Sequence, residues 1–245
     1  MNKFEISFNN YDHSFCESNN YSSEVEYINS TSALFISLIG MFGVYFNKTD
    51  INSSMFYYCL IVNGITSSIY HHTHSIGWGL LDRYSMIYLA AYCYNMLINP
   101  IIRYYPKTSH LIRINIIIYL SVLSTYTGLH NENMFNNLFG LFLVSAIAFI
   151  MFLIRVYNIN KMLVCYSVKG ILLIGLGGTC WIITENLCFQ YAVMKYLMGH
   201  ALWHVLVSLG GYYISLIPVY LALTNTETLV PIIKYKYGLP YITDK

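Results

Sequence analysis

The stretch "LFLVSAIAFIMFLI", residues 141–154, has one hydroxyl group and no charge, and no polar side repeats along it. A helix on the surface of a soluble protein would carry a polar face with a period of 3.6 residues. The whole chain shares this character, because 56% of its 245 residues are hydrophobic and only 10% are charged. Runs of about 20 apolar residues, the length that crosses a bilayer, recur at 33–51, 55–75, 79–102, 111–129, 137–156, 168–189 and 197–223. The sequence therefore predicts an all-α integral membrane protein, a bundle of seven transmembrane helices.

Lysine and arginine are unevenly divided between the two sides of this predicted bundle. Ten of the 13 fall on the side of the carboxyl terminus: Lys48, Arg103, Lys107, Arg113, Arg155, Lys161, Lys169, Lys234, Lys236 and Lys245. Because basic loops face the cytosol, we expect a lumenal or extracellular amino terminus and a cytosolic carboxyl terminus. The expected parts are a polar lumenal segment (1–32), the spanning domain (33–223) and a cytosolic tail (224–245). Since basic loops are first a topology signal, no nucleic-acid partner is expected.

Ionisable side chains inside membrane spans are costly and indicate function. Here they gather in three places: "TSSIYHHTH" (66–74) at the end of the second span, Asp82 at the start of the third, and "GHALWH" (199–204) at the start of the seventh. Alternate spans run in opposite directions, so all three places fall in one layer on the side of the amino terminus. Groups that converge in this way predict a functional site.

The two histidines of the seventh span suggest a metal centre. His200 and His204 are four residues apart and face one direction on a helix. A third imidazole from the second span would complete the set that holds a catalytic zinc ion with its fourth position open. Helix geometry leaves open which histidine of "YHHTH" (70–74) that is. Asp82 would orient a ligand or accept a proton from water. The alternatives are hydrogen-bonded structural histidines and an Asp82 that pairs with Arg83.

Six cysteines are present without a Cys-x-x-Cys pair, which argues against a thiolate metal site. Cys16 and Cys188 both fall on the predicted lumenal side, where a disulfide could tie the amino-terminal segment to the sixth span. Two unpaired thiols are the alternative, because spacing does not decide pairing. Glu185, near the same end of that span, is interpreted as a solvated residue or a cap partner.

Four stretches, taken together and in order along the chain, resemble the alkaline ceramidase family. They are "CESNNYSSEVEYINSTS" (16–32), "GITSSIYHHTHSIGWGLLDRYSMIY" (64–88), "WIITENLC" (181–188) and "GHALWHVLVSLGGYY" (199–213). The resemblance implies an intramembrane zinc amidohydrolase that cleaves ceramide into a sphingoid long-chain base and a free fatty acid. It also implies a location in the membrane of the endoplasmic reticulum or Golgi, with the plasma membrane as the alternative.

Matched position by position, the resemblance implies that His71, His200 and His204 hold the zinc ion. Ser67 and Asp82 would lie beside the attacking water, with Asp82 accepting its proton and Ser67 donating to the developing oxyanion. Both roles suit a metal centre that polarises an amide carbonyl.

The family's acidic amino-terminal motif is implied to bind calcium. Carried over, its ligands are Ser14, Phe15 through its backbone oxygen, Glu17, Asn19 and Glu26. The sequence departs from the family here, because Ser14 stands where an aspartate is usual and the spacing from Cys16 to Glu26 is two residues shorter. Loss of a carboxylate lowers calcium affinity.

Two other functions fit the same pattern. A related seven-span zinc hydrolase of the wider superfamily, which includes the adiponectin-receptor-like and Per1-like lipid-remodelling proteins, would cleave glycerolipid esters. The receptor-like branch would have a cytosolic amino terminus, against the charge distribution. A non-catalytic lipid-binding or receptor-like protein would use the histidines for structure or pH sensing. Protein partners are not indicated.

Overall fold

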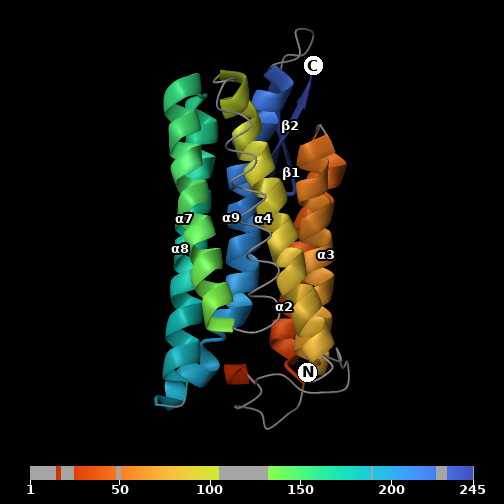
Figure 1. The fold of residues 1–245 in the computed structure, drawn as a ribbon, viewed down its shortest axis with the longest axis vertical. Coiled ribbons are helices and arrows are strands. Elements are labelled where there is room, and N and C mark those ends of the chain that lie inside the picture. Colours follow the sequence, from red (N-terminus) through yellow and green to blue (C-terminus); the bar gives the residue numbers. More distant parts are fainter. Residues whose placement is uncertain are drawn as a thin grey trace, which may run out of the picture.

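The computed structural model describes residues 15–17, 25–47, 51–104, 132–188, 190–224 and 231–244. Within these ranges, six α-helices lie side by side along the long axis of the molecule (Figure 1). They are α2 (Tyr27–Phe46), α3 (Ile51–Thr73), α4 (Ile76–Tyr104), α7 (Glu132–Tyr157), α8 (Lys161–Leu187) and α9 (Gly199–Thr224). A short 3₁₀ helix, Ala192–Tyr196, leads into α9. Each helix overlaps one predicted span, and the predicted span at 111–129 lies outside the described residues.

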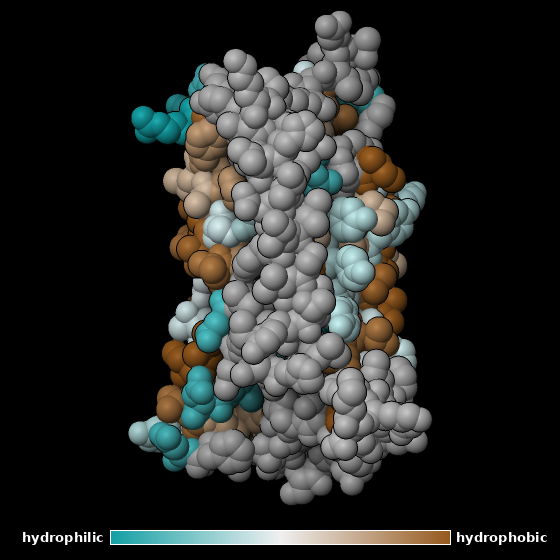
Figure 2. All heavy atoms as spheres, in the orientation of Figure 1, coloured by the Kyte–Doolittle hydropathy of each residue, from teal (hydrophilic) through white to brown (hydrophobic). Residues whose placement is uncertain are grey.

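The composition of the helices agrees with a membrane environment. In the described part of the chain, four segments are long and apolar enough to cross a bilayer: Tyr27–Phe46, Phe139–Tyr157, Lys161–Leu187 and Gly199–Thr224. Large apolar side chains also face outward, as at Val144 and Leu172, which are 65% and 67% exposed. Figure 2 shows such hydrophobic residues on both flanks of the molecule. The prediction of a helical membrane protein is confirmed, whereas the number of spans and their orientation stay predictions.

Helix α2 begins at Tyr27, six residues before the apolar run at 33–51. Its first backbone N–H groups have no partner within the helix, and the Glu17 carboxylate accepts two of them, from Ile28 at 2.6 Å and Asn29 at 2.7 Å. The polar side chains of Asn29 and Ser30 are buried in these first turns. An apolar-run criterion misses such residues, and they lie at the end of the bundle that carries the histidines.

Helices α8 and α9 cross closely at two glycines. A Cβ atom added to Gly170 would lie 2.7 Å from the backbone oxygen of Gly210, and one added to Gly210 would lie 2.7 Å from the oxygen of Gly170. Neither position has room for a side chain, so the two backbones pack directly on each other. This contact fixes α9, and with it His200 and His204, against α8.

A β-hairpin at the carboxyl end adds to the predicted all-α fold. Strands β1 (Pro231–Lys236) and β2 (Leu239–Asp244) pair antiparallel, with Pro231 opposite Asp244. A two-stranded hairpin alone is marginally stable in water, and this one packs on the helices at the end away from the histidines (Figure 1). Ile242 is fully buried. The Tyr212 hydroxyl donates to the backbone oxygen of Pro240 at 2.6 Å. The sequence predicts only a cytosolic tail for these residues.

Candidate metal centre

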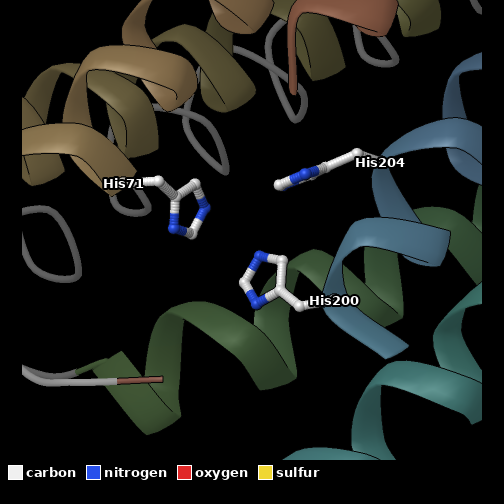
Figure 3. Close-up of side chains that lie close together, drawn as sticks. All are labelled: His71, His200 and His204. Atoms are coloured by element: carbon white, nitrogen blue, oxygen red, sulfur yellow. The ribbon is translucent and has the colours of Figure 1, made fainter. Parts of the chain in front are cut away.

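Three histidines meet at one end of the bundle. His71 lies in the last turn of α3, and His200 and His204 lie in the first turns of α9. Their ring centroids are 4.7 to 5.2 Å apart, and one nitrogen of each lies within 4.8 Å of the others. All three side chains are buried. Figure 3 shows the rings turned toward a common point, with His71 approaching from α3 and the other two from α9.

The structure selects one histidine from the three that "YHHTH" offered. His71 is 1% exposed and joins the pair from α9. His72, the next residue along the helix, is exposed. His74 lies beyond the end of α3, and its Nε2 is 3.5 Å from the Glu26 carboxylate. The three identical side chains thus have different environments, and the one at the metal site is His71, which the family resemblance also implies.

His71 and His204 each make an outward hydrogen bond through Nδ1. The Nδ1 of His71 is 2.7 Å from Oε2 of Glu26, and the Nδ1 of His204 is 2.9 Å from the hydroxyl of Ser32. A hydrogen bond at one ring nitrogen sets the tautomer and leaves the other nitrogen to bind a metal. Ser32 was not singled out from the sequence, although a hydroxyl in the first turns of a membrane helix is a visible signal.

His200 has a more distant carboxylate beside it. Its Nδ1 is 3.8 Å from Oε1 of Glu185, and Oε2 of Glu185 accepts the backbone N–H of Cys16 at 2.9 Å. A disulfide joins Cys16 to Cys188, which is one of the two alternatives that the sequence left open. The Glu185 side chain is 23% exposed and lies between the amino-terminal segment and the three histidines. This position differs from the solvated or capping role predicted from the sequence.

Phe15, in the amino-terminal segment, packs against two of the three histidines. The Phe15 ring centroid is 4.5 Å from that of His200 and 4.9 Å from that of His71. The backbone N–H of Phe15 donates to Oε1 of Glu26 at 2.9 Å. Burial raises the pKa of Glu26, but the hydrogen bonds from His71 and Asn29 and the neighbouring imidazoles of His71 and His74 together outweigh it, so the pKa of this carboxyl lies below its ordinary value. Glu26 therefore acts as an ionised acceptor at neutral pH.

The residues expected to bind calcium are only partly described. Ser14 and Asn19 lie outside the described residues. Glu17 and Glu26 converge on Asn29, the first accepting its backbone N–H and the second its side-chain amide at 3.1 Å. Burial raises the pKa of Glu17 despite the backbone hydrogen bonds that oppose the shift. These two carboxylates thus have roles in holding α2 and His71.

Ser67 and Asp82 lie on the wall of a cavity that also reaches the three histidines. Ser67 is buried and lies close to the Asp82 carboxylate. The cavity has a volume of about 160 Å³, and its lining is mostly apolar, with Phe56, Phe139 and Phe142 among the contributors.

This cavity extends far along α9. Both His200 and Pro218 line it, and 18 helical residues correspond to about 27 Å at 1.5 Å per residue. A polar centre at one end of such a cavity suits a ligand with one polar group and a long hydrocarbon chain.

The centre fits a zinc ion by the chemistry of its donors. Three imidazoles form the set found in catalytic zinc sites, which keep a fourth position open, and the Nδ1 atoms of His71 and His204 are hydrogen-bonded outward. The fold and the site together define a helical membrane protein with three buried histidines that could hold a metal ion and that line a mostly apolar cavity.

Comparison with known proteins narrows this class. The family model described as Ceramidase matches residues 10–243. The chain belongs to the ceramidase family, and the resemblance found in its motifs is confirmed. It is also similar to the alkaline ceramidase of Drosophila melanogaster, with 23% identity over 246 residues that cover 94% of this chain and 86% of that protein.

Proposed function

We propose that this protein is a zinc-dependent amidohydrolase of the membrane that cleaves ceramide into a sphingoid long-chain base and a free fatty acid. Membership of the ceramidase family supports a ceramide hydrolase in general. The observation that carries the finer proposal is the set of three buried histidines at the polar end of an apolar cavity. Ceramide has the matching form, because its single amide joins two long hydrocarbon chains.

The roles of the protein groups follow from their positions. His71, His200 and His204 would hold the zinc ion, which supplies the Lewis acidity that polarises the amide carbonyl and makes water nucleophilic near neutral pH. Water adds to the amide carbon, and Asp82 accepts its proton. The carbon–nitrogen bond then breaks, and Asp82 passes the proton to the leaving nitrogen. The products are a carboxylic acid and an amine, so atoms and charges balance.

Ser67 is assigned two successive duties. In the resting site its hydroxyl would donate to the Asp82 carboxylate, which lines the same cavity. Once Asp82 has taken a proton, that carboxyl group needs the donor less, and the hydroxyl can turn to the developing oxyanion. A buried hydroxyl that changes partners in this way would stabilise the transition state more than the ground state.

Calcium is proposed as a second, structural cation. The Glu17 and Glu26 carboxylates both contact Asn29, and Ser14, Asn19 and the backbone oxygen of Phe15 would complete an oxygen site. Hard oxygen ligands of this kind suit Ca²⁺. Calcium binding would brace the start of α2 and the carboxylate on His71. Equilibrium dialysis with calcium tests this proposal.

We also propose that residues 1–32 and the metal centre face the lumen of the endoplasmic reticulum or Golgi, with residues 224–245 in the cytosol. The distribution of lysine and arginine supports this orientation. Protease protection of a carboxyl-terminal tag in sealed microsomes tests it. Protection of that tag would refute the orientation, and with it the lumenal metal centre.

Fatty acid release from a defined long-chain ceramide by the detergent-purified protein tests the proposed reaction. We expect His71→Ala to abolish release and bound zinc, and His72→Ala to leave both near wild type, because the His72 side chain is exposed. A matched glycerolipid ester runs in parallel, since the same chemistry can attack an ester. Cleavage of the ester alone would indicate a lipid-remodelling hydrolase. Bound zinc without cleavage of either would indicate a receptor-like or lipid-binding protein.

A further inference from the structure

The side-chain amide of Asn63 is buried in α3 near the proposed site. Asn63 lies two turns before His71 and one turn before Ser67, so the three side chains share one face of the helix. It is 6% exposed and lines the same cavity as Asp82. A polar side chain at such a position in an apolar helix is costly unless its hydrogen bonds are made.

Asn63 makes two hydrogen bonds across to α4. Its Nδ2 donates to Oδ1 of Asp82 at 3.0 Å and to the hydroxyl of Ser85 at 2.9 Å. Ser85 is itself anchored, because its hydroxyl also contacts the backbone oxygen of Asp82 at 2.7 Å and the hydroxyl of Thr66 at 3.1 Å. The Asn63 amide therefore bridges the Asp82 carboxylate and the Ser85 hydroxyl.

We propose that Asn63 is a positioning residue that fixes the Asp82 carboxylate for proton transfer; this inference rests on the proposed function. Asp82 receives a hydrogen bond from the Asn63 amide, and Ser67 lies one turn further along α3 on the wall of the same cavity. A donor on a rigid helix restricts rotation of the carboxylate, and proton transfer depends on such alignment. Asn63 keeps a donor on Asp82 even while Ser67 turns to the oxyanion.

The alternative is a structural role, in which Asn63 only ties α3 to α4. The two partners of its amide separate these possibilities. Ser85→Ala removes the amide's other partner on α4 and leaves the hydrogen bond from Asn63 to Asp82. Asn63→Ala and Asn63→Val both remove the donor to Asp82, and the valine preserves more of the packed volume.

The experiment measures kcat and KM for ceramide, bound zinc and the melting temperature for these variants in detergent. We expect Asn63→Val to lower kcat about 10- to 100-fold, the usual effect of losing an outer partner of a functional group. KM and zinc content should stay within about twofold of wild type, and Ser85→Ala should keep kcat within about threefold.

Three results would overturn the role of Asn63: a kcat of Asn63→Val close to wild type, an equal loss in Ser85→Ala, or a loss confined to KM or zinc content. If Asn63→Ala fails to fold, its melting curve shows this and the valine variant decides. Failure of the proposed function is distinguishable, because the wild-type protein would then release no fatty acid from ceramide in the same assay.

Discussion

The outer partners of the three histidines predict a graded loss of zinc affinity when each is truncated. The charge-assisted hydrogen bond from His71 to Glu26 is 2.7 Å long, the neutral bond from His204 to Ser32 is 2.9 Å, and the contact of His200 with Glu185 is 3.8 Å, too long for a hydrogen bond. Hydrogen bonds with one ionised partner are about twice as strong as neutral ones.

The expected losses of zinc affinity follow from the relative strengths of these three contacts. Removing an outer partner of a metal ligand weakens metal binding about 10- to 100-fold. We expect Glu26→Ala to lie near the upper limit, about 100-fold or 2.7 kcal/mol, and Ser32→Ala near the lower, about tenfold or 1.4 kcal/mol. Glu185→Ala should cost about threefold or less, because no direct hydrogen bond is lost.

The assay is competition for zinc between the detergent-purified protein and a chromogenic chelator. Thr31→Ala is the matched control for Ser32→Ala, because the neighbouring Thr31 hydroxyl is exposed and bonds only to backbone oxygens of its own helix. Melting of the metal-free proteins identifies any variant whose fold is lost. An unchanged affinity in Glu26→Ala, or a larger loss in Glu185→Ala than in Ser32→Ala, would refute the assignment of these contacts.

Three further predictions concern the scaffold. Gly170→Ala should lower the stability of the bundle by about 1–3 kcal/mol, because the added methyl group overpacks on the backbone of α9. Gly175→Ala has open space around its Cβ and should be neutral or stabilising by up to about 1 kcal/mol. Thermal unfolding in detergent compares the two variants, and equal effects would contradict the close crossing of α8 and α9. Ile242→Ala in the hairpin should cost about 2–5 kcal/mol, while Tyr237→Ala, 82% exposed, should change little in the same measurement. Cys16→Ser breaks the disulfide that anchors the amino-terminal segment, so we expect faster proteolysis of that segment and weaker zinc retention; wild-type values for both would show that the segment is held by its hydrogen bonds alone.

The helical fold and part of the site could be predicted because they depend on local periodicity. Apolar runs of spanning length predicted helices where α2, α3, α4, α7, α8 and α9 lie, although the polar first turns of α2 were left out of the run. The spacing of His200 and His204 predicted two imidazoles on one helix face, and the structure has both in the metal centre. The hairpin was not predicted, because its stability comes from helices distant in the sequence.

By itself, the sequence determined the membrane environment, the family and the layer in which the ionisable groups lie, because each depends on composition, spacing or a motif read along the chain. Helix geometry left the choice among three neighbouring histidines open and the family motif implied His71, whereas the tertiary structure supplies the physical reason, since α3 buries His71 beside α9 and leaves His72 exposed. It also decided the outer partners: Glu26, Ser32 and Glu185 come from separate segments. Their contacts arise from helix packing and a disulfide across 172 residues, and no local pattern encodes such distances.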